Sequence, residues 1–443
     1  MRPTHGTASR TTRTAAASLT ALALLGSLVA CAPGPSSTHV PNTEFVRSDG
    51  VTARVVSVSD APALTGVVEA TRRLGTTTLG LAPRDENVVV SPAGLAVALA
   101  MLAEGARGTS LDELEAALGA SGEDRRDAFA ALRGALLEFD GDPAEATADA
   151  LPDRPIVHLA DQVVVHEDFD VSAGFLDALA DGFDAGVQYA DLTSAAGTAV
   201  LDEWVDHHTG GLIEESAIEP DDALRLVLQD AILLAARWQT PFSAHSTHDR
   251  PFTLSDGSTV DVETMAPDRG EFAYAELDGW VAVRLPYVDA VHADVLLPPS
   301  GADPGDVSAE VIATVSDALD AAPSVPIDLT LPRLDIGPAT IDLLPLLPAL
   351  GIGSITGCGT TADLSGIAGS PGDLCVDQAA QQTVLKVDEE GTVAAAVTEI
   401  GVQESSAPLV QHEIRFDRPF LFTVSHTETG WPLFLAAVRD PRH

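Results

Sequence analysis

The chain of 443 residues is 45% apolar, which is enough to bury the core of one large domain or two ordinary ones. Its 66 acidic residues outnumber the 24 Lys and Arg residues, and the formal net charge of -42 disfavours binding to nucleic acid or to an anionic membrane surface. Lys386 is the only lysine, which excludes a Gly-Lys phosphate loop and a Ser-Lys nucleophile pair. We interpret the acidity as a solvated, self-repelling surface.

The N-terminal residues have the pattern of an export signal. Three arginines within the first 13 residues precede the apolar run 15–29, which is shorter than the about 20 residues that span a bilayer as a helix. The run ends at Cys31 in Leu-Val-Ala-Cys, which resembles the lipid-attachment motif of bacterial lipoproteins; ordinary cleavage after a small residue is the alternative. We predict an extracellular protein, held at the outer face of the cell membrane only by lipid on Cys31. The predicted parts are a lipoprotein-type signal peptide over 1–30, a flexible tether over 31–55 and a single domain over 56–443.

Helical patterns come first along this domain and strand patterns follow. Apolar residues recur at spacings of three and four in 62–80 and 92–106, and Ser110, three residues before Glu113, predicts a capping box that opens a helix over 110–120. Later segments alternate or run apolar at strand length, namely 223–238, 259–265, 280–288, 292–298, 327–336 and 413–424. This order predicts an α+β domain built on large, mainly antiparallel sheets.

Two cysteines remain once Cys31 carries lipid. Cys358 and Cys375 then form an even pair in an oxidising compartment, and a disulfide between them would close the loop that separates them. Two separately buried thiols or half of a metal site are the alternatives. We predict no metal site, because no further Cys or His stands at ligand spacing.

Five ordered segments resemble one family, the serpins, over a region from about Val51 to Pro441. The strongest matches are "VDEEGTVAAAVT" at 387–398 and "FDRPFLFTVSHTETGWPLFLAAVRDP" at 416–441. The other matching segments are 87–114, 201–213 and 228–242. The resemblance implies a serpin fold, with three β-sheets, a cluster of about eight to nine helices and an exposed reactive-centre loop.

The resemblance also implies a function. Members of the family inhibit serine proteases by a conformational trap, in which the protease cuts the exposed loop and the loop inserts into the main sheet while the enzyme is still acylated. The expected partner is thus a serine protease, held as a covalent acyl complex. We expect a monomer that is not an enzyme and needs no cofactor.

The segment after Glu390 has the residues that insertion requires. Side chains alternate between the faces of a strand, so the face that begins at Thr392 is small or apolar throughout, and Glu399 lies on the other face. Gly391 supplies freedom at the hinge. A flexible linker or a helix is the alternative interpretation of this Ala-rich stretch. The predicted hinge comprises Glu390, Gly391, Thr392, Val393, Ala394, Ala395 and Ala396.

A second set of residues is expected beneath the sheet, where opening is controlled. By resemblance these residues are Ser91, Gly94, Asp230 and Gln381, with Trp238 at the top of the sheet. Gly94, Asp230 and Gln381 depart from the family's usual serine, asparagine and histidine. We expect the four to meet, with Asp230 and Gln381 forming a hydrogen-bonded latch in which a buried carboxylate must be paired or protonated.

The scissile bond is predicted at Ser405-Ser406 by counting from the hinge. Counting back from "FDRPF" gives Pro408-Leu409 instead. No Arg or Lys occurs between Gly391 and Val410, which disfavours a trypsin-like target. The small residues favour elastase-like or subtilisin-like proteases, whereas Glu404 or Leu409 would suit glutamate-specific or chymotrypsin-like enzymes.

Other functions fit the sequence less well. A non-inhibitory serpin that acts as a binding or structural protein of the cell envelope is the main alternative, and the small residues of the hinge disfavour it. A hydrolase is disfavoured because Gly-x-Ser-x-Gly is absent and His412-Glu413 has no second histidine at the required spacing. A solute-binding lipoprotein would need a two-lobed α/β pattern, which the sequence lacks.

Overall fold

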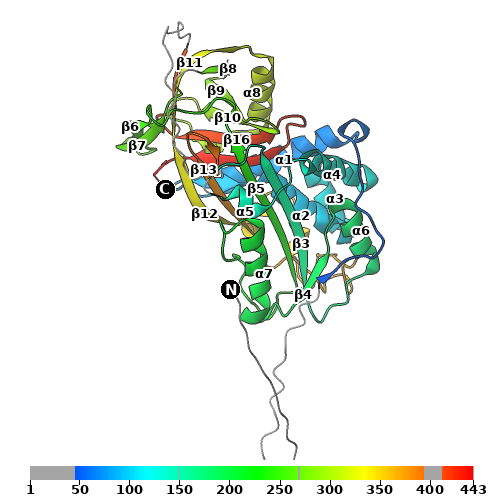
Figure 1. Cartoon of the computed structure of the whole chain (residues 1–443). Helices are drawn as coiled ribbons and strands as arrows, with labels where there is room; N and C mark the ends of the chain where they lie inside the picture. The colour runs from blue at the N-terminus through cyan, green and yellow to red at the C-terminus, as the bar shows by residue number, and fades with distance from the viewer. Residues whose placement is uncertain (1–44, 149, 268–269, 394–411, 443) are drawn as a thin grey trace, which may run out of the picture. The chain divides into compact units, whose positions relative to one another are not determined.

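The computed structural model describes residues 45–148, 150–267, 270–393 and 412–442 (Figure 1). These residues contain eight α-helices, and the predicted α+β class is confirmed. The helices are α1 (Leu64–Leu81), α2 (Pro92–Gly105), α3 (Gly108–Leu118), α4 (Gly122–Leu137), α5 (Pro143–Ala146), α6 (Ala173–Phe183), α7 (Ala195–His208) and α8 (Ala309–Ala321). Short 3-10 turns lie at Val58–Asp60, Pro304–Asp306, Leu344–Leu346 and Ser354–Thr356.

One sheet has seven strands in the order β1-β4-β3-β5-β14-β13-β12. Its longest ladder joins β3 and β5 antiparallel from Ile156 opposite Ala235 to Val165 opposite Leu226. The strands are β1 (Phe45–Val46), β3 (Ile156–His166), β4 (Val187–Ala190), β5 (Leu226–Arg237), β12 (Leu334–Asp342), β13 (Ala380–Val387) and β14 (Gly391–Thr392).

The remaining strands form a second, ten-stranded set. Strand β11 pairs with β8 at its start and with β7 at its end, which joins these strands into one path. The strands are β2 (Val88–Val90), β6 (His248–Thr253), β7 (Thr259–Met265), β8 (Glu271–Leu277), β9 (Trp280–Pro286), β10 (Val291–Leu297), β11 (Ser324–Pro332), β15 (His412–Arg415), β16 (Phe420–His426) and β17 (Pro432–Val438).

The two faces of the seven-stranded sheet are covered differently. Figure 1 shows α7 in front of the sheet, where it contacts β3, β4 and β5. The apolar helix α2 packs on β5 from the core side and also contacts β17 of the other sheet. Almost all residues of α2 are buried, which explains why apolar side chains occur on every side of this helix and not along one face only. The main core therefore lies between the two sheets and around α2.

Several predicted boundaries were wrong for local reasons. The helix predicted over 110–120 begins at Gly108, so Ser110 lies inside it, where its hydroxyl accepts a hydrogen bond from the Asp363 amide. The predicted capping box is therefore absent, and the Glu113 carboxylate accepts from the Ser354 amide instead. The segment 327–336 is divided at Arg333 between β11 and β12, which belong to different sheets.

Residues 45–55, the end of the predicted tether, lie against the domain. Phe45 and Val46 pair with β4 as an edge strand. Arg54 donates to Asp181 at 2.6 Å and to Asp127 at 2.6 Å, so the segment is fixed to α6 and α4. The predicted boundary at residue 55 is therefore too late in the chain.

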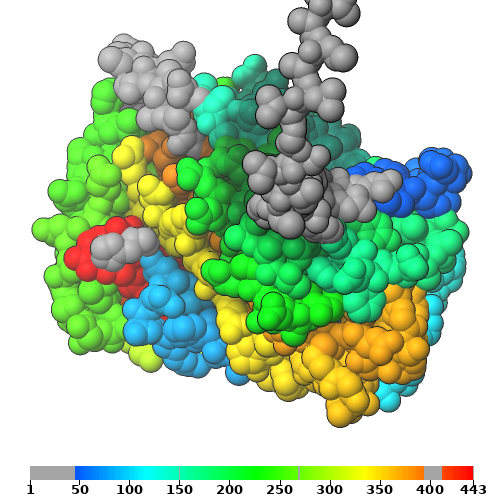
Figure 2. Space-filling model, turned by 90° about the horizontal axis from the view of Figure 1, so that it is seen from below, coloured from blue at the N-terminus to red at the C-terminus, as the bar shows by residue number. Residues whose placement is uncertain are grey.

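The last residues of the domain lie beside its first buried strand. Figure 2 shows the C-terminal segment in red next to the blue residues that precede β2. The Asn87 side chain accepts from the Arg439 amide at 2.7 Å and donates to the Asp440 carbonyl at 2.6 Å.

In the part of the chain that the structure describes, no helix has the length and apolarity to cross a membrane.

Candidate functional site

The hinge begins inside the seven-stranded sheet. Gly391 lies opposite Arg237 of β5, and Thr392 lies between Ala236 of β5 and Val387 of β13. A Cβ at Gly391 would stand 2.0 Å from the Ala236 carbonyl oxygen, so only glycine fits this close approach. The sheet thus holds the first two residues of the predicted insertion segment as the short strand β14.

Two aromatic side chains hold the hinge at the top of the sheet. The Tyr287 hydroxyl hydrogen-bonds the Thr392 hydroxyl, and its ring stacks on Trp238 with 4.2 Å between centroids. The Trp238 indole donates to the Asp388 carbonyl at 2.9 Å, and its amide donates to the Glu390 carbonyl at 2.8 Å. Burial raises the pKa of Tyr287, so the phenol keeps its proton.

Glu389 anchors the turn that leads into the hinge. Its carboxylate accepts from Arg333 at 2.5 Å and 2.9 Å and from the Thr247 hydroxyl at 2.5 Å. Burial opposes ionisation of Glu389, but the hydrogen bonds from Arg333 and Thr247 more than offset it, and the pKa of the carboxyl is lowered. The turn is therefore held by a charge-assisted network.

Val393 is the last described residue of the hinge, and its backbone is strained. Its φ of 54° lies in the left-handed region, which is uncommon for a β-branched residue. Its side chain is nevertheless buried in a small cluster with Leu151, Ile156, Leu233 and Ala235. The predicted hinge residues Ala394, Ala395 and Ala396, the reactive bond Ser405-Ser406 and the lipidation site Cys31 lie outside the described residues.

A cavity of about 120 Å³ lies in the sheet next to β14. It is bounded by Leu228–Leu234 of β5 on one side and by Ala380–Leu385 of β13 on the other. Within the described segments, no backbone pairing joins these two strands. Trp204 and Val205 of α7 and residues 216–218 of the following connector line the same cavity.

Four predicted latch residues line this cavity, namely Ser91, Gly94, Asp230 and Gln381. The Gln381 amide accepts from the Ser91 backbone amide at 2.8 Å and donates to the Ser91 carbonyl at 2.9 Å. Gln381 therefore pairs with Ser91, at the N-cap of α2, and not with Asp230 as predicted. A Cβ at Gly94 would stand 1.9 Å from the Asp230 carboxylate, so this glycine makes the space that Asp230 fills.

Asp230 lies in an unfavourable environment for a charge. It is directly opposite Asp161 on β3, and Asp161 is ion-paired with Arg133 of α4. Burial raises the pKa of Asp230 well above its usual value, the Asp161 carboxylate raises it further, and Arg133 opposes both effects. The latch therefore contains a carboxyl group that resists ionisation.

Replacing Asp230 should change how stability depends on pH. Because its pKa is raised in the folded protein, the native state keeps a proton that the unfolded chain releases. Stability is then complete below the ordinary pKa of aspartate and falls as pH rises toward the raised value. We expect Asp230→Asn to raise the melting temperature near pH 7.5 and to change it little near pH 4.

Thermal melts of both proteins across this pH range test the prediction. Asp112→Asn, on the exposed face of α3, is the control. An equal difference between Asp230→Asn and the original protein at pH 4 and pH 7.5 would show that Asp230 is not the titrating group.

Two glutamines that no sequence pattern singled out hold the connector after α7. Gln382 accepts from the Ala217 amide at 2.8 Å and donates to the Glu215 carbonyl at 3.0 Å. Gln378 makes the same pair of bonds with Glu219 at 3.0 Å and 2.8 Å. Gln381 and Gln382 are adjacent, so their side chains point to opposite faces of β13. This alternation is the sequence signal from which different roles for the two glutamines could be inferred.

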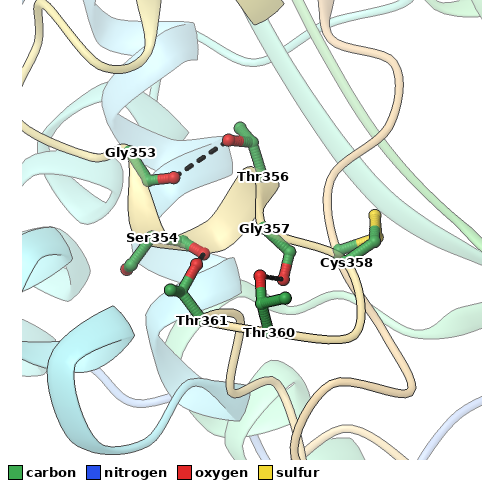
Figure 3. The surroundings of a disulfide bond; sticks show 8 residues. Gly353, Ser354, Thr356, Gly357, Cys358, Thr360 and Thr361 are labelled. Carbon is green, nitrogen blue, oxygen red and sulfur yellow. Dashed lines mark hydrogen bonds between the residues drawn. A yellow bond between two sulfur atoms is a disulfide. The ribbon is translucent and has the colours of Figure 1, made fainter.

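The structure joins Cys358 and Cys375 by a disulfide, with 5.1 Å between their Cα atoms. Figure 3 shows the turn around Cys358, in which three threonine hydroxyls donate to backbone carbonyls. Among the residues with described positions, no group of three or more His, Cys, Asp or Glu side chains is arranged to hold a metal ion.

In the described residues, β14 thus lies between β5 and β13, and a cavity lined by the same two strands lies next to it. A model of the family described as "Serpin (serine protease inhibitor)" matches residues 74–441. The chain belongs to the serpin family.

Relatives of this chain include named protease inhibitors. It is 31% identical over 374 residues to a "Serine protease inhibitor" of Cyanea capillata, with 81% of this chain and 93% of that protein covered. It is also 31% identical over 374 residues to mouse "Plasminogen activator inhibitor 1", with 81% and 88% covered.

Solved structures show the same fold. The native state of the thermophilic serpin tengpin matches with a TM-score of 0.76 at 23% identity, covering 90% of this chain and 100% of that one. Thyroxine-binding globulin in complex with thyroxine matches with a TM-score of 0.70 at 22% identity, covering 86% and 98%. The predicted serpin fold is confirmed.

Proposed function

We propose that this protein inhibits serine proteases as a suicide substrate, by inserting its cleaved loop into the seven-stranded sheet. The observation that carries the proposal is β14, because Gly391 and Thr392 already pair with β5 and β13 at one end of the cavity. Insertion would continue a strand that the native protein has begun.

The register of β14 supports the proposal. Thr392 is opposite Ala236 of β5, so residue 398 of an extended strand would be opposite Asp230. Ala236 and Leu234 belong to the main core, whereas Leu233 and Ala235 pack with Val393 on the other face. The alternate residues from Thr392 to Val402 would thus face the core, and all of them are small or apolar. Glu399 would face the side covered by α7.

The proposed reactive bond is Ser405-Ser406, and the proposed targets are elastase-like or subtilisin-like proteases with shallow pockets. Cleavage at Pro408-Leu409 or after Glu404 would indicate a chymotrypsin-like or glutamate-specific target instead. Mass spectrometry of the released C-terminal fragment identifies the bond, and a fragment that begins at Leu409 would overturn our choice.

We further propose that the chain is exported by residues 1–30 and that Cys31 carries lipid, which would place the inhibitor on the outer face of the cell membrane. The proposed inhibitor is a monomer that acts without a cofactor. Its partner is the protease alone, bound as an acyl-enzyme.

A panel of serine proteases tests the function. We expect at least one of them to give an adduct that survives denaturing gel electrophoresis and has the mass of the protease plus the inhibitor lacking its C-terminal fragment. The same protease with its catalytic serine replaced by alanine should give none, because no acyl bond can form. If every protease tested cleaves the protein as an ordinary substrate and forms no adduct, the result would favour the non-inhibitory binding function.

A further inference from the structure

A chain of hydrogen bonds fixes the end of α7 to the sheet. The His158 Nδ1 atom of β3 lies 2.7 Å from an Asp140 carboxylate oxygen, and its Nε2 atom lies 3.0 Å from Nδ1 of His208, the last residue of α7. The two imidazole rings are nearly parallel, at 7°, with centroids 5.3 Å apart. Asp140 lies just after α4, so the chain joins three separate parts of the fold.

The protons of this chain can be counted. The Asp140 carboxylate accepts from Nδ1 of His158, which leaves Nε2 of neutral His158 as an acceptor. His208 then donates from Nδ1, and a single proton lies between the two rings. One further proton leaves the bond intact, either on Nε2 of His208 or on Nε2 of His158 with a change of tautomer at His208, but a second would set N–H against N–H. The bond therefore exists only while the pair is incompletely protonated.

The surrounding groups disfavour a charge on His208. Burial lowers its pKa to about 4, and His158 and His207 lower it too, while Asp140 opposes them. Asp161 of β3 also interacts electrostatically with His158, but the Asp161 carboxylate is ion-paired with Arg133. Because a released His208 would regain the ordinary pKa of 6.5, it would take up a proton that the bonded form refuses. Release therefore becomes progressively easier as pH falls from 6.5 to about 4.

The end of α7 lies over the cavity into which the loop would insert. Trp204 and Val205 line this cavity, and the Trp204 ring packs on His208 with 4.5 Å between centroids. A second contact lies just after α7, where the Thr147 hydroxyl donates to the Gly210 carbonyl at 2.9 Å. Movement of α7 away from His158 would uncover the space between β5 and β13.

We propose that Asp140, His158 and His208 are positioning residues that clasp α7 over the cavity and release it in acid, so that loop insertion becomes faster as pH falls. The proposal rests on the proposed inhibitory function for its consequence. The clasp itself is independent of that function and can be tested alone.

Hydrogen exchange of α7 as a function of pH is the test. After correction for intrinsic exchange, we expect the opening equilibrium of the last turn of α7 to rise by up to about 100-fold between pH 6.5 and 4.5, since one proton contributes at most tenfold per pH unit. The amides of α1 are the internal control. Equal pH dependence of both helices would overturn the proposal.

Two variants separate the clasp from a purely structural role. His208→Asn keeps a donor at the position of Nδ1 but cannot titrate, so the opening of α7 should change less than threefold over the same range. The matched control, His207→Asn, removes the neighbouring imidazole but none of the three clasp residues, so the opening of α7 should keep its strong pH dependence. Asp140→Asn, at an exposed position, should loosen α7 already at neutral pH. If His208→Asn retains the full pH dependence, the clasp is not the switch.

The consequence for inhibition is measured with a protease that forms the covalent adduct. The ratio of the insertion rate at pH 5 to that at pH 7.5 should be at least tenfold higher in the original protein than in His208→Asn. If no protease forms an adduct, the proposed function fails while the exchange experiment still decides the clasp. If adducts form at the same ratio in both proteins, the clasp does not control insertion.

Discussion

Cleavage of the loop between Gly401 and Val410 is expected to raise the melting temperature, by up to about 10 to 20 °C. Roughly a dozen residues would gain ladder hydrogen bonds on both sides, at a net ~1 kcal/mol each, which gives about 10 to 20 kcal/mol before the ordering entropy is subtracted. Unfolding entropy scales with chain length, so each kcal/mol moves the midpoint of a domain of this size by only about 1 °C.

Differential scanning calorimetry before and after limited proteolysis measures this shift. The cleaved chain must remain associated, which size-exclusion chromatography shows. An unchanged midpoint, with the new chain end still open to a second protease, would contradict insertion and with it the proposed mechanism.

Three features destabilise the native state in ways that the proposed insertion would relieve. Val393 has a left-handed backbone, which costs on the order of 1 to 3 kcal/mol and would relax in an extended strand. Among the residues with described positions, no strand pairs with the facing edges of β5 and β13 where they line the cavity. Asp230 faces this cavity with a pKa that is raised by burial. The proposed insertion would relieve or change each of them.

The sequence predicted local elements better than their ends. The run 92–106 forms α2, and 259–265 forms β7 with the predicted bounds, because periodicity reflects one continuous buried face. The strand predicted over 413–424 is two strands, β15 and β16, which pair with different partners. Periodicity alone cannot show that neighbouring residues belong to different ladders.

The sequence carries a signal for the proposed site only where one segment holds the whole pattern. The small residues after Glu390 indicated insertion, whereas the contacts of Tyr287 and Glu389 with the hinge join residues far apart in sequence. Gln381 was predicted in the latch, but its partner depends on the position of α2, so the predicted bond to Asp230 was wrong. Such pairings follow from tertiary packing, which no local pattern contains.

Replacement of Gly391 by valine is expected to convert the inhibitor into a substrate. A Cβ at this position would stand 2.0 Å from the Ala236 carbonyl oxygen and 2.7 Å from the Leu151 side chain. The backbone oxygen cannot move without breaking the β5 ladder, so β14 must leave the sheet. Valine favours strands intrinsically, so any loss of insertion would come from this contact and not from propensity.

The measurement is the number of inhibitor molecules consumed per protease molecule trapped. We expect Gly391→Val to raise this stoichiometry at least tenfold, with cleaved but unstabilised inhibitor accumulating, because slow insertion lets the acyl bond hydrolyse first. Gly337→Val in β12 is the matched control, since a Cβ there would meet nothing within 4 Å. If Gly391→Val trapped protease as efficiently as Gly337→Val, the strand begun by β14 would not be the one that the cleaved loop extends.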